Sequence, residues 1–98
     1  MLKVRTSSGK EFNIDHCVLA VYGIMRMLYI EFIGYSMAEI FPVFSNNSET
    51  STIYALEGDK VEHVYSGYVN VKELFQVPDT NDHVRIRLEP NVSVERFG

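Results

Sequence analysis

Cysteine, tryptophan and basic charge are scarce in this chain of 98 residues. The single cysteine, Cys17, excludes an intramolecular disulfide, and it excludes the paired cysteines of a zinc ribbon or a dithiol redox motif. Nine basic residues against 13 acidic ones give a net charge of −4, so the basic excess typical of nucleic-acid-binding proteins is missing. We therefore expect no direct contact with nucleic acid.

Long apolar runs are also missing. The longest apolar stretch is interrupted by Arg26, Glu31 and Glu39, so the sequence predicts no membrane-spanning segment and no membrane partner. The opening stretch MLKVRTSSGKEF has no apolar core of the kind found in secretory signals. Because the chain also cannot form an internal disulfide, we expect it in the cytoplasm.

Motifs that carry chemistry are absent as well. The six glycines are scattered singly, so there is no phosphate-binding loop, and no GxSxG nucleophile motif occurs. Cys17 adjoins His16, but adjacent strand residues point to opposite faces, which keeps the imidazole from activating the thiol. The three histidines, His16, His63 and His83, lack the spacing of metal ligands. We predict no catalytic residue, no metal site and no cofactor, and a small enzyme is the least favoured hypothesis.

The chain does contain short apolar runs separated by turn residues, a spacing typical of a mainly β domain. Alternation predicts an opening hairpin of residues 2–6 and 10–14 around the turn Ser7-Ser8-Gly9. Further strands are predicted at 17–22, 26–33, 50–56, 60–65, 68–77 and 83–88. Within 68–77, the spacing of Val71, Leu74 and Phe75 would also suit a helical turn. The strand at 26–33 is apolar on both faces, which is typical of a central or doubly covered strand.

A change of period predicts one short helix over residues 36–44. Ser36 and Glu39 match a capping box, which marks the start of a helix. The apolar residues that recur at helical spacing are Met37, Ile40, Phe41 and Phe44. Pro42 limits the length of this helix, because proline removes a backbone donor.

These elements predict a single β-rich domain over residues 1–89, followed by a C-terminal tail at 90–98. The economical arrangement is a small antiparallel barrel or sandwich of about seven or eight short strands with one short helix. The alternative is an α+β sheet with one covering helix.

Two groups of residues are candidate binding sites. Alternation in the last strand puts His83, Arg85 and Arg87 on one face, a stripe that fits a small anionic nucleotide or the acidic surface of a protein. The same charges also suit a solvated strand that avoids edge pairing. The second group is aromatic, because six tyrosines and six phenylalanines exceed what so small a core can hold. The tyrosines expected at an interface, rather than half-buried on strands, are Tyr22, Tyr29, Tyr35, Tyr54 and Tyr68.

Three stretches, in this order, resemble small β-rich accessory proteins encoded by phages and prophages of Gram-positive bacteria. They are Ser8-Gly9-Lys10-Glu11-Phe12, the run 37–52 with Val43-Phe44-Ser45 leading to Glu49-Thr50, and Ser66-Gly67-Tyr68. The resemblance implies a phage or mobile-element origin and brings no catalytic residues. It implies either an inhibitor of host defence that acts by stoichiometric binding or a virion accessory protein.

The first hypothesis is therefore a non-enzymatic protein that counters bacterial defence in the host cytoplasm. Its partner would be a host defence protein, such as a CRISPR effector, or a nucleotide signal that it sequesters. The alternative is a virion or tail accessory protein that forms a homo-oligomer, for which exposed strand edges and aromatic faces are suited.

Overall fold

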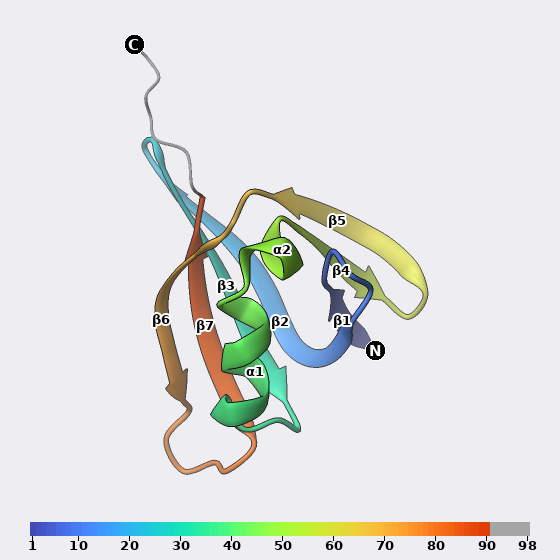
Figure 1. Ribbon diagram of the computed structural model, residues 1–98, viewed down its shortest axis with the longest axis vertical. Coiled ribbons are helices and arrows are strands. Elements are labelled where there is room, and N and C mark those ends of the chain that lie inside the picture. Colours follow the sequence, from blue (N-terminus) through green and yellow to red (C-terminus); the bar gives the residue numbers. More distant parts are fainter. Residues whose placement is uncertain (91–98) are drawn as a thin grey trace.

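The computed structural model describes residues 1–90, which form one seven-stranded antiparallel sheet with two short helices on one side (Figure 1). The strands are β1 (Leu2–Arg5), β2 (Glu11–Tyr22), β3 (Met25–Ile33), β4 (Thr52–Glu57), β5 (Lys60–Ser66), β6 (Asn70–Gln76) and β7 (His83–Glu89). The helices are α1 (Met37–Phe44) and α2 (Asn47–Thr50). The strand order is β5-β4-β1-β2-β3-β7-β6.

The mainly β prediction is confirmed. The sheet is not closed into a barrel, since β5 and β6 stand at its two ends, so a sandwich-like or α+β arrangement describes the chain. The expected single helix is joined by a second, α2, which the sequence pattern did not predict. There the Asn46 side chain accepts a hydrogen bond of 3.0 Å from the Ser48 N–H, which caps the helical turn. Most of the predicted tail, residues 91–98, lies outside the described residues.

Strand β2 connects the two halves of the sheet. Its residues 11–13 pair with β1, and its residues from Ile14 to Tyr22 pair with β3. The register shifts between Ile14 and His16, so Asp15 forms a β-bulge. The sequence predicted separate strands at 10–14 and 17–22, but the bulge joins them into one strand of 12 residues. Because a bulge bends its strand and increases the local twist, the two halves of the sheet turn away from each other here.

The core lies between the sheet and α1. Alternate residues of β3 and β7 are fully buried on this inner face: Leu28, Ile30, Phe32, Val84, Ile86 and Leu88. From the helix, Ile40 and Phe44 pack against them. The Phe44 ring lies 5.0 Å from that of Phe32 and 5.6 Å from that of Phe12, measured between centroids. These aromatic contacts fix α1 on the inner face of β2, β3, β7 and β6.

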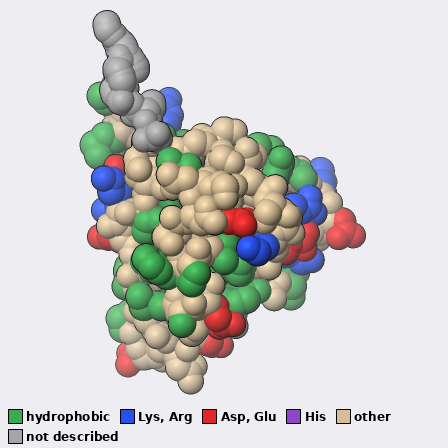
Figure 2. Space-filling model, in the orientation of Figure 1, with side chains coloured by type: hydrophobic (Ala, Val, Ile, Leu, Met, Phe, Trp, Pro, Cys, Tyr) green, Lys and Arg blue, Asp and Glu red, His purple; other side chains and the backbone are tan. Residues whose placement is uncertain are grey.

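The helical side of the molecule has two surface types (Figure 2). Hydrophobic side chains are grouped over α1, where Phe41 is half exposed, whereas charged side chains gather towards β1, β4 and β5. The connection from β5 to β6 crosses the sheet (Figure 1), and its Tyr68 is buried in the core. The inner face is therefore covered by both α1 and this connection.

Candidate binding site on the outer face of the sheet

The outer face is the surface of β2, β3, β7 and β6 that points away from α1. Because side chains alternate along a strand, the neighbours of the buried core residues point to this side. It holds a shallow pocket of about 510 Å³. The pocket is lined by His16, Val18, Ala20, Tyr29, Glu73, Phe75 and Arg85. Four strands thus contribute to one open, partly charged and partly apolar surface.

Glu31 lies at the centre of the polar half of this face and is only 8% exposed. Its Oε1 accepts hydrogen bonds from Arg85, at 2.8 Å from Nη2 and 3.2 Å from Nε. Its Oε2 lies 3.2 Å from His83 Nδ1. The hydrogen bond from Arg85 is the main cause that holds the pKa of Glu31 below its usual range. Glu31 is therefore ionised at neutral pH and its charge is compensated.

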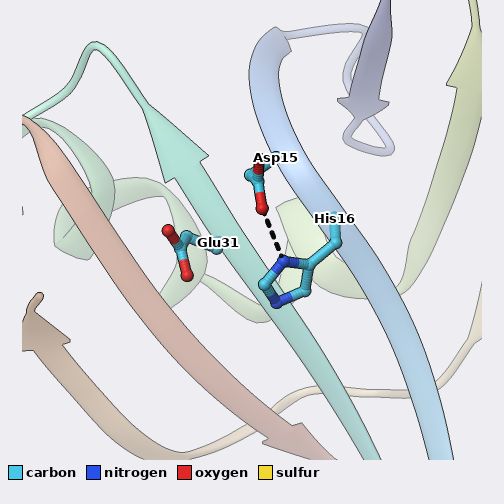
Figure 3. Close-up of side chains that lie close together, drawn as sticks. All are labelled: Asp15, His16 and Glu31. Carbon is cyan, nitrogen blue, oxygen red and sulfur yellow. Dashed lines mark hydrogen bonds and ion pairs between the residues drawn. The ribbon is translucent and has the colours of Figure 1, made fainter.

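The bulge in β2 brings two more polar side chains to Glu31. Asp15 and His16 both reach the outer face, where Asp15 Oδ2 lies 3.0 Å from His16 Nδ1 (Figure 3). One ligand-type atom from each of Asp15, His16 and Glu31 lies within 4.8 Å of the other two. Carboxylate and imidazole groups are ligands that divalent transition metals accept. The arrangement seen here is a hydrogen-bonded network, in which Glu31 already contacts Arg85 and His83.

The predicted cationic stripe, His83, Arg85 and Arg87, occupies one face of β7, and acidic residues accompany it. Arg87 Nη1 donates to Glu89 Oε2, and Arg87 Nε lies 3.5 Å from Glu73 Oε1. Arg85 and His83 contact Glu31, as described above. Each residue of the stripe thus has a carboxylate neighbour, and an incoming anion would compete with these carboxylates.

Apolar side chains complete the outer face. The Arg85 guanidinium carbon lies 5.7 Å from the centre of the Phe75 ring, at the distance of a cation–π contact. Phe75 is 37% exposed and Val18 is 50% exposed. The Tyr29 hydroxyl donates to Met27 Sδ at 3.6 Å, so its ring is held against the sheet. Arginine and aromatic side chains are enriched at protein–protein interfaces, and Arg85, Phe75 and Tyr29 supply them here.

The five tyrosines of the predicted interface fall into three groups. Tyr22 is 67% exposed at the end of β2, and Tyr29 lines the outer pocket. Tyr54 is half-buried on β4. Tyr35 packs against the core and Tyr68 is itself buried there, so neither is available on the outer face.

Two other titratable groups, Cys17 and Glu49, have pKa values far from their usual range. Burial raises the pKa of the Cys17 thiol to about 12, so almost no reactive thiolate exists at neutral pH. Glu49 in α2 accepts hydrogen bonds from Ser8 at 2.6 Å, Thr6 at 2.7 Å and Lys10 at 3.1 Å. Hydrogen bonds from Ser8, Thr6 and Lys10 lower the pKa of Glu49 to about 2. They fasten the β1–β2 turn to α2.

No protein family, curated protein or solved structure matches this chain. Within residues 1–90, no helix has the length and apolar character needed to cross a membrane.

The sequence pattern indicated the stripe on β7 but missed its acidic partners. Glu31 and Glu73 lie on β3 and β6, which flank β7 in the sheet. Their approach depends on strand order, which alternation along one strand cannot reveal. Asp15 and His16 were missed as a pair because alternation places adjacent residues on opposite faces, and only a bulge overrides that rule.

Proposed function

We propose that this chain is a non-enzymatic, phage-encoded protein that counters bacterial defence by binding a host defence protein stoichiometrically. The binding surface is the outer face of β2, β3, β7 and β6. The observation that carries the proposal is this face itself, because it is uncovered in the described chain and combines Phe75, Tyr29 and Val18 with paired charges. The phage origin rests on the resemblance of the three sequence stretches.

The charge pattern favours a protein over a nucleotide as the partner. Phosphates would have to displace Glu31 from Arg85, and Glu73 and Glu89 from Arg87. The chain as a whole also carries a net charge of −4. A protein surface can instead cover the apolar side chains and leave the ion pairs in place, which gives specificity without a large desolvation cost.

The buried titratable groups support a non-enzymatic role. A general acid or base works best when its pKa lies near the operating pH. The pKa values of Glu31 and Glu49 are lowered by their hydrogen bonds, and the pKa of Cys17 is raised by burial. All three groups are thus moved away from the range in which they could transfer protons or attack a substrate at neutral pH.

The test is affinity purification of the tagged protein from a Gram-positive host that carries active defence systems, followed by mass spectrometry. Wild type is expected to recover one defence protein in near-equimolar amount. Phe75→Ala is expected to abolish recovery, because it removes an exposed aromatic side chain that lines the outer pocket. Phe41→Ala is the matched control, since Phe41 is 54% exposed on α1 and far from this face in the fold.

Two results would count against the proposal. Recovery of the same protein by Phe75→Ala at the wild-type level would remove the outer face from the interaction. Recovery of a nucleotide from the purified protein, with no protein partner, would favour sequestration of a signal molecule instead.

A virion or tail accessory protein is the second candidate, and the tip of the β2–β3 hairpin favours it. Tyr22, Ile24 and Met25 are 67%, 91% and 53% exposed there. Gly23, with φ of +61°, lets the two strands join through a tight turn that presents these side chains to solvent. An assembly contact would bury them. Mass spectrometry of purified phage particles decides this candidate, because a virion component must be present in them.

A further inference from the structure

The sheet has an interior strand with one open edge. β1 is only four residues long and pairs with β2 at residues 11–13. From His16 to Tyr22, β2 therefore has β3 on one side and, among residues 1–90, no backbone partner on the other. The side chains along this edge are exposed as well, with Val18 at 50%, Val21 at 51% and Tyr22 at 67%. Unpaired backbone groups beside exposed apolar side chains form a template for another strand.

The other two edges of the sheet are protected, and this edge is not. β5 carries Lys60 and Glu62, and β6 carries Lys72, Glu73 and a register shift next to them. Charges and bulges of this kind discourage pairing between sheets. By contrast, the segment 17–22 reads Cys-Val-Leu-Ala-Val-Tyr, without a charge, a proline or a glycine.

We infer that this edge pairs with the same edge of a second copy of this chain, antiparallel and centred on Ala20. In that register Ala20 faces the partner's Ala20, Val18 faces the partner's Tyr22 on the outer face, and Leu19 faces the partner's Val21 on the inner face. Aromatic and β-branched side chains are favourable cross-strand neighbours, and no like charges meet. The segment is thus complementary to itself, which a symmetric dimer requires.

The symmetry of this dimer has a consequence for the outer face. Antiparallel pairing of two identical edges places the two-fold axis perpendicular to the sheet, so both outer faces point to the same side. The two pockets would then flank a seam of Val18 and Tyr22 side chains. The dimer would present two copies of the surface to a partner, but its formation does not depend on that partner.

The test is made on the full chain and changes Ala20, the residue that lies at the two-fold axis of the proposed dimer. Sedimentation equilibrium of wild type is expected to show a concentration-dependent dimer of the 11.3 kDa chain. Ala20→Lys and Ala20→Glu each place two like charges opposite each other, which we expect to raise the dimer dissociation constant about tenfold or more. An equimolar mixture of the two variants is expected to dimerise again, since lysine then faces glutamate.

The mixture also distinguishes charge repulsion from a folding defect, because two unfolded variants could not restore the dimer. The matched control is Val64→Lys, which adds the same charge to an exposed position on the β5 edge and is expected to leave the dimer intact. The inference is overturned if wild type is monomeric at every concentration, or if Val64→Lys weakens the dimer as much as Ala20→Lys does. It is also overturned if those amides of 18–22 that point away from β3 resist hydrogen exchange in a monomer, because another segment would then cover the edge.

Discussion

The two faces of the sheet are made by the same strands and differ in almost every physical property. On β3, Ile30 is fully buried under α1, whereas its neighbour Glu31 is held on the outer face by Arg85. On β7, Ile86 is likewise buried between two arginines that point outward. The inner face therefore carries the hydrophobic stabilisation of the fold, and the outer face is left with charges that neutralise one another. This division allows the outer face to serve binding without loss of the core.

We expect the largest loss of stability from a substitution on the inner face. Phe44→Ala removes a fully buried ring that packs against Phe12 and Phe32, so we expect it to lower the free energy of unfolding by about 3–5 kcal/mol. Urea unfolding followed by circular dichroism measures this loss. Phe41→Ala, on the same helix, is the control and is expected to cost less than about 1 kcal/mol because Phe41 is exposed. Equal losses in the two variants would contradict the assignment of the core.

The two buried carboxylates, Glu31 and Glu49, should make the stability of the fold depend on pH. Their pKa values in the folded chain lie below the ordinary value of 4.5, and that of Glu49 is about 2. A lowered folded pKa contributes stability that is fully present above about pH 4.5 and is lost as the pH falls towards the folded value. We therefore expect the free energy of unfolding to fall between about pH 4.5 and pH 2.

Urea unfolding at a series of pH values measures this slope. Glu49→Gln is expected to flatten it more than Glu31→Gln does, because Glu49 has the larger displacement of pKa. Glu49→Gln keeps an acceptor oxygen for Ser8 and Thr6, so the variant changes the titration more than the packing. A slope unchanged in Glu49→Gln would show that other groups govern acid unfolding.

Local sequence patterns predicted much of the fold. Strict alternation predicted the strand at 83–88, and the structure has β7 at His83–Glu89. The capping box predicted the start of α1, where the Ser36 N–H donates to Glu39 Oε1 at 2.8 Å. Both signals lie within a few residues of the element that they specify. Strand order does not, because it depends on contacts between distant segments. The open edge of β2 likewise follows from long-range pairing, since β1 is only four residues long and pairs with β2 at residues 11–13.

The site was harder to predict than the fold for the same reason. The stripe on β7 is a local pattern, and the structure places its three residues on one face. Its neutralisation requires Glu31, 54 residues away from Arg85 in the sequence. The bulge at Asp15 depends on the pairing of β2 with two different strands. Long-range pairing of this kind leaves no periodic trace in a single sequence.

We expect the smallest loss of stability from a substitution on the outer face. Phe75 is 37% exposed, and its cation–π contact with Arg85 contributes about 0.5–1 kcal/mol. Phe75→Ala is therefore expected to lower the free energy of unfolding by about 1 kcal/mol or less, measured by urea unfolding beside Phe44→Ala. If the same variant also loses its protein partner, binding and stability reside on opposite faces of one sheet. A loss as large as that of Phe44→Ala would instead make Phe75 part of the core, and its effect on partner recovery would then reflect unfolding.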